Sequence, residues 1–134
     1  MTERQLALVS AARRAVLRMD ESERPRLVVL GVGGGADWLV GAFGPWLGRR
    51  LATWYYLVAT DRSVFVLTGP GGGDGPNRAL HMAPLAEAAG LVAGVKRGTT
   101  WNSLWLRLPG RRRPVRVKVS YHSRTELDRF LAKL

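Results

Sequence analysis

The chain has no cysteine and only two histidines among its 134 residues. Disulfide bonds and thiolate metal sites are therefore excluded, and nothing in the composition indicates an oxidising compartment. Neither His81 nor His122 has a carboxylate or a second histidine at the spacing of a metal site. The serines lack the sequence context of a nucleophile elbow, and Asp37, Asp61 and Glu87 form no recognisable acid–base pair. We therefore expect no enzymatic activity, no cofactor, no metal and no small-molecule substrate.

The chain has one long, weakly charged hydrophobic segment, and glycines and a proline interrupt it. The segment 27–48 has Asp37 as its single charged residue and is long enough to cross a bilayer. It also contains seven glycines and Pro45, which disfavour a helix by about 1 and about 3 kcal/mol each. A strand followed by a glycine-rich apolar loop is the better interpretation. The N-terminus leads into an arginine-bearing helical pattern rather than a hydrophobic signal sequence, so we expect a cytoplasmic protein.

Acidic residues are scarce, and they are missing from one long region. The chain has 21 Lys and Arg against 10 Asp and Glu, which gives a formal net charge of +11. No acidic residue occurs between residues 88 and 125, where the basic residues are Lys96, Arg97, Arg107, Arg111, Arg112, Arg113, Arg116, Lys118 and Arg124. This excess favours an anionic partner, which could be an acidic protein, a phospholipid surface or a nucleic acid.

Patterns typical of strands dominate the rest of the chain. Residues 2–19 have helical periodicity and begin with a capping box of Thr2 and Gln5, and a polar linker follows up to Pro25. The expected strands are 27–32, 53–60, 63–69, 79–84, 91–97, 101–108 and 114–121. A helix over 83–93 is the alternative to the two weakest strands, and the segment 36–51 is either a short helix or a loop.

The chain ends in a predicted amphipathic helix. Ser123 and Glu126 have the spacing of a capping box that begins it. Its apolar residues recur at helical spacing and form one stripe, which consists of Leu127, Phe130, Leu131 and Leu134. We expect this stripe to be part of the core.

The strands 53–60 and 63–69 flank the corner Thr60-Asp61-Arg62-Ser63, which is the pattern of a β-hairpin. This hairpin resembles the one with a Thr-Asp-Arg turn in bacterial pleckstrin-homology-like (PH-like) domains. The last two strands, their Pro109-Gly110 turn and the terminal helix extend the resemblance over about residues 25–134.

The resemblance implies a mainly β (α+β) fold. It predicts a partly open barrel of about seven antiparallel strands in two packed sheets, capped by the C-terminal amphipathic helix, with an extra N-terminal helix. Residues 1–24 would then be the N-terminal helix and linker, and 25–134 the PH-like domain. Such domains bind partners and rarely catalyse reactions.

Strand alternation divides the basic region into two faces. If the leucines of 101–108 and the valines of 114–121 point inward, the outward residues are Trp101, Ser103, Trp105, Arg107, Arg116 and Lys118. Antiparallel pairing would place them side by side as one aromatic and basic face. Either this face binds an anionic partner through arginine contacts and tryptophan stacking, or its tryptophans are covered by the N-terminal helix or the segment 36–47.

A second candidate surface is the segment 36–50. It contributes the aromatic residues Trp38, Phe43 and Trp46, followed by Arg49 and Arg50. We predict a non-catalytic interaction or adaptor module that binds a protein partner or a second copy of the chain through these two surfaces. One alternative is peripheral attachment to the inner face of an anionic membrane through 36–50. The other is nucleic-acid binding through the face at 96–118.

Overall fold

Seven strands and two long helices account for most of the chain in the computed structural model, which describes residues 2–33, 41–44, 47, 52–71 and 74–134. The first half of the molecule contains α1 (Glu3–Met19), β1 (Pro25–Gly33), β2 (Thr53–Thr60), β3 (Ser63–Pro70) and β4 (Arg78–Pro84). The second half contains the 3-10 helix η1 (Leu85–Gly90), β5 (Val92–Lys96), β6 (Trp101–Leu106), β7 (Val115–Ser120), the 3-10 turn η2 (Tyr121–Ser123) and α4 (Arg124–Lys133).

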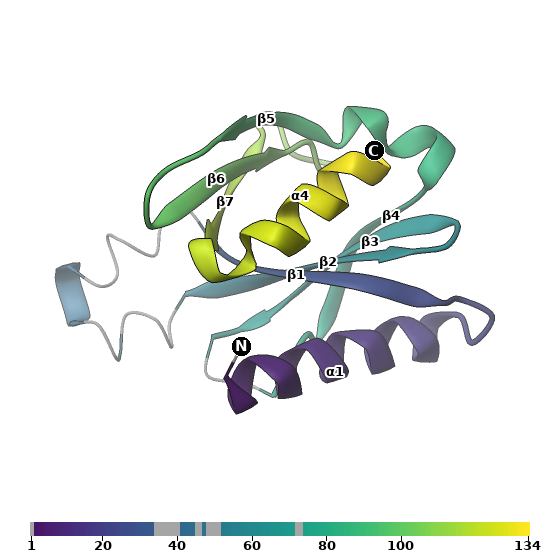
Figure 1. Ribbon diagram of the computed structural model, residues 1–134, viewed down its shortest axis with the longest axis horizontal. Coiled ribbons are helices and arrows are strands. Elements are labelled where there is room, and N and C mark those ends of the chain that lie inside the picture. Colours follow the sequence, from purple (N-terminus) through teal and green to yellow (C-terminus); the bar gives the residue numbers. More distant parts are fainter. Residues whose placement is uncertain (1, 34–40, 45–46, 48–51, 72–73) are drawn as a thin grey trace.

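All seven strands belong to one antiparallel sheet with the order β4-β3-β2-β1-β7-β6-β5. Among the described residues, the two halves of the sheet join through two residue pairs, Val32 with Lys118 and Gly33 with Val117. The sheet curls around α4, while α1 lies on the opposite side of β1 (Figure 1). The prediction of a mainly β fold with a helix at each end is confirmed. The expected two packed sheets are instead one sheet, because β1 continues the hydrogen bonding into β7.

Gly31 permits the close approach of β7 to β1. A Cβ atom at this position would overlap with Cγ1 of Val117, and it would also contact Val119 and the backbone of Lys118. A glycine inside a strand commonly marks such a close approach of two backbones.

Each face of the sheet has its own hydrophobic core. The inner cluster lies under α4 and combines Leu127 and Phe130 of that helix with residues of both sheet halves, such as Val29, Leu57 and Leu104. The outer cluster lies under α1 and consists of Leu8, Ala12, Val16, Val28, Leu30, Tyr56, Val58, Phe65 and Leu67. Residues of β1 and β2 alternate between the two clusters, as expected for a strand covered on both faces.

The helix stripe predicted at the C-terminus is confirmed, whereas its predicted capping box is wrong. Leu127 and Phe130 are fully buried, and Leu131 and Leu134 pack against the same cluster. The side chain of Ser123 makes no capping hydrogen bond. The turn η2 precedes the helix and holds Ser123 at φ −105° and ψ 16°, away from the extended geometry that an N-cap residue adopts. At the N-terminus, the Thr2–Gln5 capping box of α1 is confirmed.

The region between β4 and β5 contains no long helix. The two weak strands are present as β4 and β5, and the helical tendency of the alanines is limited to the short 3-10 helix η1. Residues 41–43 form a helical turn, and the rest of the ambiguous segment 36–51 lies largely outside the described residues. Among the described residues, no helix is both long and apolar enough to cross a membrane.

The corner at residues 60–63 is a tight hairpin held by side-chain hydrogen bonds. Thr60 Oγ1 accepts hydrogen bonds from the backbone N–H groups of Arg62 (3.2 Å) and Ser63 (2.9 Å). The Arg62 guanidinium donates to Glu23 Oε1 at 3.2 Å and Asp20 Oδ2 at 3.1 Å, and it also bonds to Ser22 Oγ. These contacts tie the linker after α1 to the hairpin, so the corner has a structural role.

A second ion pair fixes the same end of the sheet. The Arg26 guanidinium donates two hydrogen bonds to the Asp61 carboxylate, at 2.8 and 3.0 Å. Hydrogen bonding to Arg26 lowers the pKa of Asp61. Hydrogen bonds from the side chain and backbone of Ser22 lower the pKa of Asp20 in the linker.

Candidate partner-binding face

The outward face of β6 and β7 is set by the burial of the inward residues. Leu104 and Leu106 of β6 and Val117 and Val119 of β7 are fully buried in or against the inner cluster. Because side chains alternate along a strand, the intervening residues must point to the other side of the sheet. The predicted inward and outward sets are therefore confirmed for both strands.

The register brings the predicted aromatic and basic residues together. Trp105 lies opposite Arg116, and Ser103 lies opposite Lys118. The Arg116 Cζ atom is 5.7 Å from the centroid of the Trp105 ring, and the Lys118 Nζ atom is 5.6 Å from the centroid of the Trp101 ring. Both distances are within the range of a cation–π interaction.

Arg116 is held by a second contact. Its Nε and Nη2 atoms donate to Ser103 Oγ at 3.2 and 3.0 Å. Ser103 is buried beneath this guanidinium although it points outward. A side chain held in this way loses less conformational entropy when it binds a partner.

We call Lys96, Trp101, Trp105, Arg116 and Lys118 the basic–aromatic face. Lys96 belongs to it because it lies opposite Ser103, which in turn lies opposite Lys118. Sequence analysis included Lys96 in the range 96–118 but did not name it among the partner-binding residues, because its position depends on the pairing of β5 with β6. Its position in the region without acidic residues is the sequence feature that could have identified it.

The face continues the surface on which α1 packs, but α1 does not cover it. Lys118 is paired with Val32, and residues paired across antiparallel strands lie on the same face of a sheet. Val28 and Leu30 lie on that face under α1. The helix packs on β1 and β2 and lies away from β6 (Figure 1), and 37% of the Trp101 surface remains exposed. The interpretation in which α1 covers the tryptophans is therefore wrong, and the alternative in which the segment 36–47 covers them falls largely outside the described residues.

Trp54 lies where the covered and uncovered parts of this surface meet. It is paired with Val32, which is itself paired with Lys118. Trp54 is half-buried against the outer cluster, and its buried Nε1 atom has no hydrogen-bond partner among the described residues. Sequence analysis missed this residue as a neighbour of the face, since only the β1–β7 pairing connects the two.

Arg107 is separated from the two cation–aromatic pairs. It follows the end of β6, where its backbone N–H donates to Leu91 O at 2.7 Å and its guanidinium to Gly90 O at 3.3 Å. The side chain is exposed but is directed to the chain just before β5. Arg107 thus lies at the margin of the face.

Part of the positive charge of the face has no acidic partner among the described residues. Arg97 does form an ion pair, at 2.6 Å, with Asp128 of α4. The two residues are far apart in the sequence, so sequence analysis did not predict this contact. Neither Lys96, Arg107 nor Arg116 forms an ion pair within the described chain. The arginines 111–113 in the β6–β7 turn are exposed as well. The surface can therefore attract an anionic group and hold it beside two aromatic rings.

The second candidate surface is described only in part. Phe43 lies in the helical turn at 41–43, and 51% of its surface is exposed. Trp38, Trp46, Arg49 and Arg50 lie outside the described residues. Of the second candidate surface, the structure therefore places only Phe43.

No protein-family model matches the chain, and no curated protein or solved structure matches it. The geometry of the surface is therefore the basis of the functional proposal.

Proposed function

We propose that this chain is a non-catalytic interaction module with a PH-like scaffold, which binds an acidic protein partner through the basic–aromatic face. The observation that carries the proposal is the pair of tryptophan rings, each beside a cation, on a part of the sheet that α1 leaves uncovered. Tryptophan and arginine are the residues most enriched at the energetic centres of protein interfaces.

The arrangement of elements supports the PH-like scaffold. Consecutive strands are antiparallel neighbours except β4 and β5, which are the two edges of the sheet and are joined through η1, while β1 pairs with β7. The C-terminal helix fills the inside of the curled sheet with Leu127 and Phe130. These features agree with the resemblance carried by the hairpin at residues 60–63, and fold alone does not identify a ligand.

An acidic protein suits the face better than a nucleic acid. Lys118 and Arg116 lie beside the two tryptophan rings, so stacking a base on either ring would require the cation to move. Carboxylates can pair with the same cations without disturbing either ring. A second copy of the chain suits the face less well, because two such faces with a net charge of +11 on each molecule would repel one another.

Attachment to an anionic membrane is the second candidate function, and the exposure of Phe43 favours it. An exposed aromatic side chain can insert at the boundary between headgroups and acyl chains, and nearby arginines would attract anionic lipids. Arg49 and Arg50 follow Phe43 closely in the sequence.

A charge-reversal experiment tests the acidic-protein proposal. Proteins that the wild-type chain captures from the native host are purified, and their affinities are measured by calorimetry for wild type and for Arg116→Glu/Lys118→Glu. The matched control is Arg111→Glu/Arg112→Glu, which changes net charge equally on the same hairpin but away from the tryptophans. We expect the first variant to lose binding by about two orders of magnitude or more and the control to lose much less, with similar melting temperatures. Equal losses in both variants would contradict a role for the face.

Co-sedimentation separates the alternatives. Binding to duplex or single-stranded DNA should weaken steeply with salt if the face binds nucleic acid. Binding to phosphatidylglycerol vesicles that survives high salt and is lost in Phe43→Ser would favour the membrane candidate. Neither behaviour is expected for the acidic-protein proposal.

A further inference from the structure

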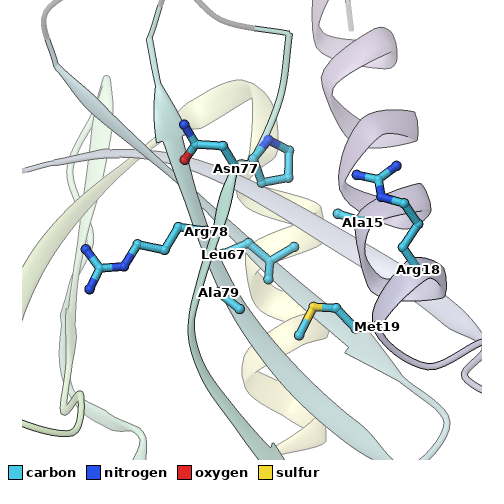
Figure 2. Close-up of a pocket in the computed structure, with 8 residues that line it drawn as sticks. Ala15, Arg18, Met19, Leu67, Asn77, Arg78 and Ala79 are labelled. Atoms are coloured by element: carbon cyan, nitrogen blue, oxygen red, sulfur yellow. The ribbon is translucent and has the colours of Figure 1, made fainter.

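We infer that the groove between α1 and β4 is a second docking site, which binds an extended peptide of alternating acidic and apolar residues as an additional strand beside β4. The groove has a volume of about 290 Å³. It lies at the β4 edge of the sheet, whereas the basic–aromatic face lies on β5, β6 and β7 toward the other edge. Ala15, Arg18 and Met19 of α1 form one wall, and Asn77, Arg78 and Ala79 form the other, with Leu67 between them (Figure 2). This volume suits a few peptide side chains rather than a larger ligand.

The strand beside the groove has a free edge. β4 is the last strand of the sheet, and within the described chain it pairs with β3 alone. The outer N–H and C=O groups of such a strand can form a ladder with an incoming extended segment, and this is a common mode of peptide recognition.

Because of a bulge in β4, Ala79 and Met82 both face the side of the sheet on which α1 packs. Ala79 is paired with Leu67 and Met82 with Phe65, and the extra residue Leu80 lies at the irregularity between them. Leu67 and Phe65 both belong to the cluster under α1, so Ala79 and Met82 face that side as well. Met82 is 52% exposed and Met19, on the facing wall, is 50% exposed. Flexible methionine side chains of this kind adapt to apolar groups of a partner.

The charges around the groove define the partner's polar side. Arg18 and Arg78 lie on the two walls, and neither forms a hydrogen bond or ion pair with a described residue. Arg78 is paired with Thr68, on the opposite face from Leu67, and its side chain extends away from Leu67 (Figure 2). A strand added beside β4 would therefore present apolar side chains to the groove and acidic ones toward Arg78. None of the groove residues is acidic.

Strand addition can be recognised by selective N-methylation of a probe. A fluorescein-labelled peptide of alternating Glu and Val is titrated with the full chain, and binding is followed by anisotropy. Two further peptides carry N-methyl groups on all valines or on all glutamates. In an antiparallel or parallel pair, alternate residues direct their N–H groups toward the neighbouring strand. We therefore expect one methylated peptide to lose affinity by about tenfold or more and the other to bind nearly as before. Equal binding of both, or no binding of the parent peptide, would overturn the inference.

Point variants locate the site. Arg78→Glu, which reverses the charge that faces the acidic residues of the peptide, should lower the affinity for the parent peptide by about tenfold, whereas the control Arg14→Glu, on α1 and outside the groove, should change it little. Amide chemical shifts should move along residues 78–84 and at the C-terminal end of α1. Chemical-shift changes confined to β6 and β7, or equal losses of affinity in the two variants, would show that the peptide does not bind in the groove. Because Arg116→Glu/Lys118→Glu leaves the groove intact, retained peptide binding in that variant separates this site from the basic–aromatic face.

Discussion

Phe130 is the residue whose side chain contributes most to the inner core from the C-terminal helix. It is 0% exposed and packs with Leu127 between the two halves of the sheet. Phe130→Ala removes the buried ring and leaves a cavity, so we expect the free energy of unfolding to fall by about 3–5 kcal/mol. Urea denaturation of the variant measures this loss, with the exposed Arg129→Ala as the control. A loss below about 1 kcal/mol would mean that the ring is not packed as described.

Gly31 is the residue that lets the sheet continue from β1 into β7. In Gly31→Ala the new methyl group would overlap with Val117, and overpacking of this kind costs about 1–3 kcal/mol. At Gly90 a Cβ atom would meet nothing within 4 Å, so Gly90→Ala is the matched control. Thermal unfolding should show a clear decrease for the first variant and little change for the second. The reverse order would contradict the close approach of the two strands.

Asp61 makes the free energy of unfolding depend on pH in the acidic range. Its pKa is lowered in the folded protein by hydrogen bonding to Arg26, so its stabilising contribution is present above the ordinary carboxyl pKa of 3.8 and is lost as pH falls below it. The pair is exposed, so the effect should be small. We expect the urea midpoint of wild type to fall between neutral pH and pH values below that pKa, and to fall less in Asp61→Asn. An identical pH dependence in both proteins would show that the pair contributes nothing.

At the scale of elements, α4 joins the two halves of the sheet. Its buried side chains contact residues of β1 and β7, and within the described part of the chain these two strands pair directly through two residue pairs. Removing residues 124–134 would expose the inner cluster on both halves. We expect the truncated chain to lose cooperative thermal unfolding and the dispersion of its amide resonances. A truncated protein with a sharp transition near that of wild type would contradict this role of the helix.

The whole molecule has a net charge of +11, and this charge opposes folding through self-repulsion. The described chain has four salt bridges, and only the Glu23 side chain among their partners is buried, so attractive pairs offset little of this repulsion. At 0.1 M salt, screening acts beyond about 10 Å. We therefore expect the melting temperature to rise from low to moderate KCl concentration. The rise should be smaller in Arg111→Glu/Arg112→Glu, whose net charge is lower, and a fall with salt would mean that attractive pairs dominate.

Local patterns in the sequence predicted most of the secondary structure. Alternation alone assigned Leu104 and Val117 to the core and Trp105 and Arg116 to the surface, because side chains of a half-buried strand must alternate. Helical spacing likewise identified Leu127 and Phe130. The Ser123 capping box failed because residues 121–123 form a 3-10 turn, which the spacing of two polar residues cannot distinguish from a helix start.

By itself, then, the sequence determined most of the strands and both long helices, the buried residues of β6, β7 and α4, and where positive charge accumulates. Only the tertiary structure decided that β1 pairs with β7, that Asp128 reaches Arg97, that Trp54 and Lys96 adjoin the predicted face, and that α1 leaves this face uncovered. The physical reason is that burial imposes a period on neighbouring residues in each element. Contacts between distant segments depend instead on how whole elements pack, and no short pattern in the chain records that choice.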